Sequence, residues 1–254
     1  MRMLFLGDVV GTTGRDAVRA VVPQARRDLE LDYVVVNGEN SAGGRGITAQ
    51  IAEEFFAWGV DVISGGNHTF NVRDVYPYLD QTPGILRPIN YPSGAPGRGV
   101  GTCGDLTVIN VIGRAFMAAD YDDPFRAVDA AIKQAPEGQF ILVDFHAEAT
   151  SEKQAMGWYL DGRVMCVVGT HTHVPTADQR LLPKGTAYCT DAGMCGARDS
   201  VIGDEVEAVL ERFLTQMPTR LPPAKGTPMV NGILVEADPM TKMATKIERF
   251  DRIL

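Results

Sequence analysis

The chain has 254 residues, with 24 Lys and Arg against 32 Asp and Glu, which gives a net charge of −8. A chain of this length forms a sizeable core without disulfide bonds, and 45% hydrophobic residues exclude a disordered protein. The acidic balance argues against an extended nucleic-acid surface or an anionic-membrane surface, but it allows one focused site for a small anion. Only four histidines are present, so each can be followed individually.

Sequence features that bear on location are few. The N-terminal apolar stretch, Met3–Leu6, is far shorter than the core of a signal peptide. No stretch approaches the ~20 apolar residues of a membrane helix. The four cysteines contain no Cys-x-x-Cys pair, and Cys166 and Cys189 lie in apolar runs, which is typical of buried, reduced thiols. We therefore expect a cytoplasmic protein.

Short apolar runs alternate with helical patterns along the chain. The predicted strands are Met3–Leu6, Tyr33–Val36, Val60–Ser64, Leu106–Ile112, Phe140–Phe145, Val164–Val168, Thr186–Thr190, Gly232–Glu236 and Ala244–Phe250. The predicted helices are Arg15–Leu29, Thr48–Trp58, Asp123–Ala135, one opened by a capping box at Ser151, and Gly203–Gln216. This order predicts an α/β fold that begins with βαβ units and ends in a mixed sheet or a second, packed sheet.

The segment 77–104 has a different composition, with 5 of the 15 prolines and 6 of the 27 glycines. We expect no regular element there and a segment that wraps over the surface beside the site. Neither a repeat nor a strong linker divides the chain, so residues 1–254 are predicted to form a single domain.

Polar residues follow the predicted strands, and every histidine lies just beyond a strand's C-terminal end. In open α/β sheets this edge is where ligands bind. The candidate residues at these positions are Asp8, Glu39, Asn40, Asn67, His68, His146, His171 and His173. Carboxylate, imidazole and amide oxygen together suit Fe, Mn or Zn. Because the donors outnumber the needs of one four-coordinate ion, two adjacent ions with a bridging carboxylate are favoured, an arrangement suited to phosphoryl transfer.

Several motifs together resemble those of the calcineurin-like metallophosphoesterases, most closely the YmdB-like branch. The residues that carry this resemblance are Gly7-Asp8, Gly38-Glu39-Asn40, Gly66-Asn67-His68, His146 and Gly169-Thr170-His171-Thr172-His173. The resemblance implies an αββα sandwich of two mixed β-sheets flanked by helices. It also implies a dinuclear site, commonly of iron, and hydrolysis of small phosphodiesters that include 2′,3′-cyclic nucleotides.

Site roles carried over from the family form a definite hypothesis. One ion would be held by Asp8, Glu39, Asn40 and His173. Glu39 would bridge to a second ion, which is held by Asn67, His146 and His171. His68 would be the general acid that protonates the leaving oxygen, after in-line attack by hydroxide generated between the ions.

The sequence departs from the broader superfamily at three places. Asp8-Val9-Val10 replaces the usual Asp-x-His, and Gly38-Glu39 replaces the usual Gly-Asp bridging motif. Thr69 stands where an acidic residue often follows Gly-Asn-His. These changes leave the metal's identity open and His68 without its usual carboxylate. A non-catalytic, metal-dependent regulator that binds a nucleotide or an RNA end is the alternative reading, and a nucleotide-cofactor oxidoreductase is a weaker one.

Two further features near the predicted site each allow a functional and a structural interpretation. Loop 41–46, with Arg45, either contacts substrate phosphate or is an ordinary turn. Asp144 and Glu148, which flank His146, are either partners of the metal ligands or structural residues. The expected partner is a small phosphodiester or cyclic nucleotide, with no extended nucleic-acid surface and no membrane. A homo-oligomer is compatible with the sequence, which identifies no interface.

Overall fold

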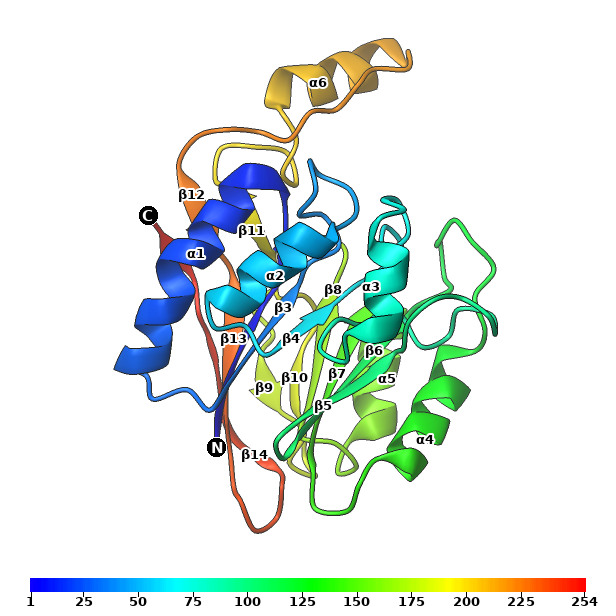
Figure 1. The fold of residues 1–254 in the computed structure, drawn as a ribbon, viewed down its shortest axis with the longest axis vertical. Helices are drawn as coiled ribbons and strands as arrows, with labels where there is room; N and C mark the ends of the chain where they lie inside the picture. Colours follow the sequence, from blue (N-terminus) through cyan, green and yellow to red (C-terminus); the bar gives the residue numbers. More distant parts are fainter.

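The computed structural model describes residues 1–254 and contains two large mixed β-sheets that face each other (Figure 1). In spatial order, the first sheet consists of β14 (Ala244–Arg249), β13 (Gly232–Ala237), β1 (Arg2–Leu6), β3 (Tyr33–Asn37) and β4 (Val62–Ser64). The second consists of β5 (Val100–Cys103), β6 (Leu106–Ile112), β7 (Phe140–His146), β8 (Cys166–Thr170), β10 (Ala187–Cys189) and β9 (Arg180–Leu181). Within each sheet the strands that precede the candidate residues run parallel.

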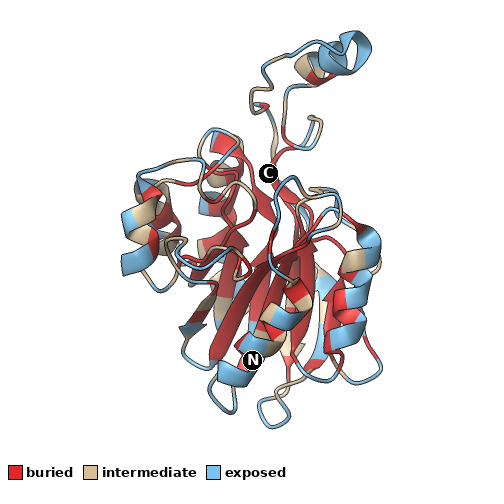
Figure 2. Ribbon diagram, turned by 90° about the vertical axis from the view of Figure 1, so that its right-hand side faces the viewer, coloured by how far each residue is buried: buried red, intermediate tan, exposed pale blue.

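Alternating side chains of the strands enter different hydrophobic clusters, which defines the layers. In β1, Met3 and Phe5 pack between the two sheets, whereas Leu4 and Leu6 pack on the opposite face. That outer face is covered by α1 (Gly11–Asp28), α2 (Ala49–Ala57) and α3 (Val75–Gln81). The outer face of the second sheet is covered by α4 (Pro124–Gln134) and α5 (Thr150–Leu160). These layers confirm the predicted αββα sandwich, and Figure 2 shows its strands buried.

A third, smaller sheet extends the first one. It contains β15 (Arg252–Ile253), β12 (Pro228–Val230), β11 (Met194–Ala197) and β2 (Asp8–Val9). Only Gly7 separates β1 from β2, and only Asn231 separates β12 from β13. A Cβ on Gly7 would lie 1.9 Å from the Gly193 carbonyl oxygen, so glycine is required where the chain turns from one sheet into the other.

The prediction that segment 77–104 holds no regular element is wrong. Helix α3 extends into it, and β5 forms the edge of the second sheet by antiparallel pairing with β6. Pro77 is compatible with α3 because it lies in the first turn, where a backbone N–H has no helical partner. Val75 and Leu79, four residues apart, anchor α3 in the core.

Helix boundaries differ from those expected at some ends. Thr48 caps α2 as predicted, because its side chain accepts a hydrogen bond from the N–H of Ile51. Helix α1 begins at Gly11 instead of Arg15. The predicted capping box at Ser151 is wrong, since α5 begins at Thr150 without a side-chain cap.

One helix stands apart from the sandwich. Helix α6 (Val206–Thr215) projects beyond the body at the top of Figure 1, and most of it is exposed in Figure 2. We call residues 202–222, which contain α6, the arm. Its neck is closed by two backbone hydrogen bonds, from Glu205 N–H to the Pro222 carbonyl and from Ala224 N–H to the Gly203 carbonyl. No helix of the chain is both long and apolar enough to cross a membrane.

Candidate metal centre

The parallel strands bring the candidate residues together at one end of the sandwich. Asp8, in β2, comes just after β1, Glu39 follows β3, and Asn67 follows β4; β1, β3 and β4 are strands of the first sheet. His146 is the last residue of β7, and His171 directly follows β8, both in the second sheet. The centre is therefore built from both sheets, at the edge where the sequence placed it.

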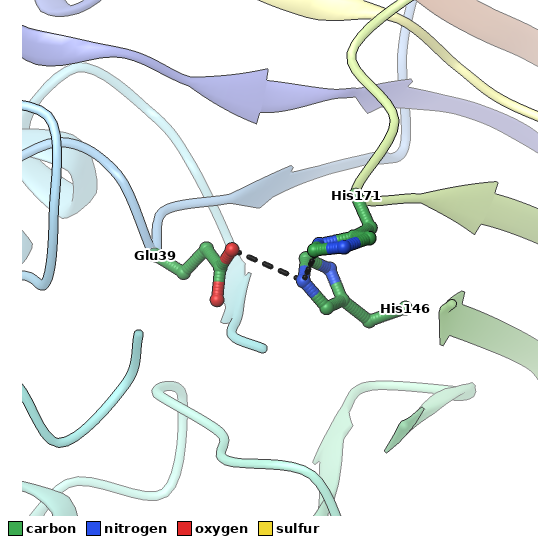
Figure 3. Close-up of side chains that lie close together, drawn as sticks. All are labelled: Glu39, His146 and His171. Atoms are coloured by element: carbon green, nitrogen blue, oxygen red, sulfur yellow. Dashed lines mark hydrogen bonds and ion pairs between the residues drawn. The ribbon is translucent and has the colours of Figure 1, made fainter. Parts of the chain in front are cut away.

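Glu39, His146 and His171 form the tightest group, with one ligand atom of each within 4.8 Å of the others (Figure 3). Nε2 of His146 lies 3.0 Å from Oε1 of Glu39 and 3.1 Å from Nδ1 of His171. Oδ1 of Asn67 lies 2.9 Å from the same Nε2. Four potential ligand atoms from four separate segments thus face a common point.

The protonation of His146 follows from its hydrogen-bond chain. The Thr170 hydroxyl donates to Oδ1 of the buried Asp144 at 2.7 Å, so it accepts the bond from Nδ1 of His146 at 2.9 Å. Nδ1 therefore carries the proton, and Nε2 presents a lone pair to Glu39 and Asn67. This is the tautomer of a metal-binding histidine.

The other two imidazoles follow the same scheme. Nε2 of His171 pairs with the Glu148 carboxylate at 3.1 Å, which leaves Nδ1 facing His146. Nδ1 of His173 donates to the Ile202 carbonyl at 2.7 Å, which leaves Nε2 facing the centre. In all three histidines one nitrogen is held by an outer acceptor while the other faces inward.

Asp8 supplies a buried oxygen without a hydrogen-bond partner. Its Oδ2 accepts a bond from the His171 N–H at 3.0 Å, but Oδ1 has no partner and is fully buried. This oxygen lies 3.8 Å from Nε2 of His173. An unpartnered carboxylate oxygen beside inward-facing nitrogens fits a cation, since a cation satisfies all of these lone pairs together.

Burial penalises the charged form of each of these groups. It raises the pKa of Asp8 and of Glu39 above the ordinary carboxyl range. It also lowers the pKa of His146 to about 4 and that of His171 to about 3. A divalent cation fits this set, because it provides the positive charge that buried carboxylates require and binds neutral imidazole.

Two neighbours complete the geometry. A Cβ on Gly66 would lie 2.3 Å from both Oε2 of Glu39 and Nε2 of His146, so any side chain there would fill the centre. Asn40 directs its amide Nδ2 at Glu39 and at His173, each 3.2 Å away. Its oxygen faces the centre only after a 180° turn of the amide, an orientation that is assigned from hydrogen bonding.

His68 lies at the opening of the centre instead of inside it. Its backbone N–H donates to Oε2 of Glu39 at 2.9 Å. Nδ2 of Asn71 lies 3.2 Å from Nδ1 of His68, and donation by this amide places the imidazole proton on Nε2. Thr69 bonds both the N–H and the carbonyl of Gly66, so it holds this turn and does not replace the missing acidic residue.

The loop that carries His171 and His173 is held by a buried ion pair. Both histidines have positive φ, 92° and 65°, which is unfavourable for residues with a side chain. Nζ of Lys153 lies 2.8 Å from Oδ2 of Asp191, and both residues are buried. Between the histidines, Thr172 accepts from Lys153 and donates to Asp191, which fixes the strained turn.

Four further residues of the site were not predicted from the sequence: Lys153, Asp191, Asn71 and Thr170. Lys153 could have been recognised from the sequence. It lies on the apolar stripe of α5 with Met156 and Leu160, and a charged residue buried there needs a partner. Asn71 and Thr170 could not, since their roles depend on contacts that only the fold creates. Of the flanking pair, Asp144 bonds Thr170 and Glu148 bonds His171.

A cavity of about 710 Å³ lies in front of the centre. The residues that reach it from the centre are Glu39, Asn40, His68, His171 and His173. Other lining residues come from loop 41–46 and from the arm. The volume lies within the ~300–1,000 Å³ typical of small-molecule sites.

The four-layer sandwich with this group of side chains at its strand ends defines a metallophosphoesterase-type fold. The chain matches the model of the YmdB-like protein family over residues 4–250, and it belongs to that family. It is 46% identical over 254 residues to the 2′,3′-cyclic-nucleotide 2′-phosphodiesterase of Bacillus subtilis strain 168, covering 98% of this chain and 96% of the relative.

Solved structures agree with this assignment. A protein from Thermus thermophilus is similar with a TM-score of 0.93 and 41% identity, covering 100% of this chain and 99% of that one. A phosphatase from Mycoplasma pneumoniae is also similar, with a TM-score of 0.93 and 33% identity over 100% of this chain and 93% of that one. These likenesses extend over the whole sandwich and the arm.

Proposed function

We propose that this protein hydrolyses 2′,3′-cyclic nucleotides with two metal ions held at the strand ends. That the chain is a metal-dependent phosphodiesterase follows from its family and its relatives. The substrate, the number of ions and iron as the metal are the parts proposed here. The observation that carries the proposal is the convergence of inward-facing, unprotonated donors on one point from both sheets.

The donor set divides into two groups around Glu39. We assign Asp8, Asn40 and His173 to one ion, since Nε2 of His173 lies near both Asn40 and Asp8. We assign Asn67, His146 and His171 to the other, since Nε2 of His146 lies close to an atom of each of the other two. Imidazole, carboxylate and amide oxygen without thiolate suit Fe, with Mn and Zn as alternatives of the same class. When bound, paired ions would lower the pKa of a bound water molecule and offset the negative charge on the phosphoryl oxygens during an in-line displacement.

The protein's own residues supply orientation and a proton. His68 lines the cavity with its proton on Nε2, and it is the group placed to protonate the ribose oxygen that leaves phosphorus. The buried network of Lys153, Thr172 and Asp191 holds two ligands in register. Glu39 fixes the backbone of His68, so ligand and acid keep a constant relation.

Hydrolysis of 2′,3′-cyclic AMP by metal-analysed protein, with and without chelator, tests the proposal. We expect about two ions per chain, turnover that chelation abolishes, and restoration by Fe or Mn. Full metal loading with no turnover of 2′,3′-cyclic AMP or of bis(p-nitrophenyl) phosphate would contradict the proposal and favour the regulator that binds without catalysis. A single ion per active chain would contradict the dinuclear part alone.

A further inference from the structure

Three arginines line the cavity without a partner of their own. They are Arg45 of loop 41–46 and Arg212 and Arg220 of the arm. None of their guanidinium groups forms an ion pair or a side-chain hydrogen bond within the chain. Seven arginines elsewhere in the chain do pair with carboxylates, namely Arg2, Arg19, Arg26, Arg114, Arg163, Arg198 and Arg249. In a protein of net charge −8, unpaired cations gathered at one cavity indicate an anionic ligand.

The arm that carries two of these arginines is anchored to the centre. Ile202 at its base has φ 49°, a left-handed conformation that is rare for a β-branched residue. That conformation accompanies the bond between the Ile202 carbonyl and Nδ1 of His173. Gly203 follows with φ 103°, and Val201 and Asp204 close the turn through two backbone bonds of 3.0 Å. The strained turn thus fixes where the arm begins relative to a proposed metal ligand.

The arm's side of the cavity is positive on balance. Asp204 is the acidic residue that the arm adds to the lining, against Arg212 and Arg220 of the arm and Arg45 opposite. Ile202 and Leu221 add apolar surface between the charges. Guanidinium groups on an apolar wall match a ligand that combines phosphate with a nucleoside.

The size of the cavity shows that the phosphate at the centre does not fill it. About 710 Å³ is available, and a water molecule's share of liquid volume is ~30 Å³, so a single phosphoryl group occupies a small part. In a 2′,3′-cyclic nucleotide the 2′ and 3′ oxygens are both bound to the phosphorus that reacts. The ribose 5′-oxygen is therefore the position where the sugar carries any further phosphate.

We propose that Arg212 and Arg220, with Arg45, bind a second phosphate on the 5′-oxygen of the ribose whose cyclic phosphate reacts at the metal centre. This inference rests on the proposed function and refines its substrate class. Such a phosphate is either the 5′-monoester of a free nucleotide or the internucleotide link of an RNA that ends in a 2′,3′-cyclic phosphate. Both present the same anionic oxygens to the arginines.

Three substrates test this inference on the metal-loaded protein. They are adenosine 2′,3′-cyclic phosphate with a 5′-hydroxyl, the same nucleotide with a 5′-phosphate, and a diadenosine ending in a 2′,3′-cyclic phosphate. We expect kcat/KM to be roughly tenfold higher for a substrate with a 5′ phosphate group, the effect of one or two charge-assisted hydrogen bonds. A larger gain for the monoester identifies the free nucleotide as the source, and a larger gain for the dinucleotide identifies RNA.

Variants connect the preference to the arm. In Arg212→Ala with Arg220→Ala, the ratio of kcat/KM between 5′-phosphorylated and 5′-hydroxyl substrates should fall toward one. Arg198→Ala is the matched control, because Arg198 is exposed, pairs with Asp199 and does not line the cavity. It should keep the wild-type ratio, and circular dichroism of all variants checks that they fold.

Each contrary outcome has a separate meaning. Turnover of the 5′-hydroxyl nucleotide with a wild-type ratio near one would overturn this inference and leave the proposed function intact. An equal loss on all three substrates in the double variant would also overturn it, because the arginines would then act on the reacting phosphate. No turnover of any substrate would overturn the proposed function, and this inference with it.

Discussion

The metal centre and the arm face the same cavity but are built in opposite ways. At the centre, Asp8, Glu39 and His146 are almost fully buried and are fixed by bonds from both sheets. In the arm, Val209 is the buried residue of α6, whereas Leu214 is 83% exposed. At the centre, the packing of both sheets fixes the positions of the reactive side chains. In the arm, a short neck holds the helix and the charges of its arginines provide the contacts to a ligand.

This contrast predicts where substitutions matter. A substitution at the centre removes a buried hydrogen bond or ion pair. The loss is large, because water does not reach the partner group that is left behind. A substitution on the outer surface of the arm changes the free energy of unfolding little, because water already surrounds the side chain.

Glu39→Gln should have the largest effect, because it removes charge from the carboxylate at the middle of the donor set while keeping its shape. We expect bound metal to fall below one ion per chain, and activity to fall by more than the ~10- to 100-fold that an outer partner of a metal ligand contributes. Elemental analysis and turnover measure both. Glu211→Ala, an exposed change on the arm, is the control, and full metal occupancy in Glu39→Gln would contradict the bridging role.

His68→Ala should separate catalysis from metal binding. Loss of a general acid typically costs ~10²–10⁴-fold in rate. Since the His68 side chain lies outside the ligand group, both ions should remain. Steady-state kinetics and metal analysis on the same sample provide the test, and a variant that loses metal would show that His68 is a ligand.

Lys153→Met should destabilise the fold by about 3–5 kcal/mol, because it leaves the Asp191 carboxylate buried without its counter-charge. Urea unfolding measures the change. The exposed pair of Lys246 and Glu248 provides a matched control, where Lys246→Met should cost much less because solvent screens the pair. Equal losses in the two variants would mean that the buried pair does not hold the ligand loop.

The metal-free protein should show two imidazoles that stay neutral through mild acid. Burial lowers the pKa of His146 to about 4 and of His171 to about 3, so their resonances should not titrate between pH 8 and 5. Because the unfolded chain takes up these protons near pH 6.5, their contribution to stability is present above that pH and is lost as pH falls toward 4.

Nuclear magnetic resonance is the appropriate measurement for this expectation. Asp8 and Glu39 have raised pKa values and change stability in the opposite direction, so an unfolding curve would mix the two effects. A midpoint near 6.5 for either His146 or His171 would contradict the buried, neutral state described above.

Leu214→Ser should have the smallest effect on the isolated chain. The side chain is 83% exposed on α6, so its replacement should change the free energy of unfolding by at most about ±0.5 kcal/mol. Urea unfolding at fixed protein concentration measures it. A loss of several kcal/mol would show that the arm's apolar face is packed in solution and that the arm is not held by its neck alone.

The convergence of the site was predictable because strand ends can be read locally. Polar residues that interrupt apolar runs marked the end of each strand. Parallel pairing of β1, β3 and β4 brings Asp8, Glu39 and Asn67 to one edge, and His146 joins them because the second sheet packs on the first. The tautomers were not readable, because Thr170 and Glu148 select them through contacts between different strands. Segment 77–104 was misjudged since local proline and glycine content outweighed the pairing of β5 with β6.

The position of the arm was not predicted, for a different reason. Its helix was expected from periodicity, but the pattern of α6 does not say whether the apolar face meets the body or points away. The chain enters the arm through Ile202 and Gly203, which both have positive φ, a conformation that is rare for a β-branched residue such as Ile202 and that the sequence does not reveal. Arg212 and Arg220 therefore looked like ordinary surface residues in the sequence.

Glu39 follows a strand of the first sheet and His146 ends a strand of the second, which has a mechanical consequence. An ion bound between them ties the two halves of the sandwich together, as a cross-link does, at the end where the strands of both sheets deliver their ligands. Stability of the whole chain then rises with the logarithm of free metal concentration. A protein that folds in a metal-poor environment is thus less stable as well as inactive, which links its lifetime to the supply of its cofactor.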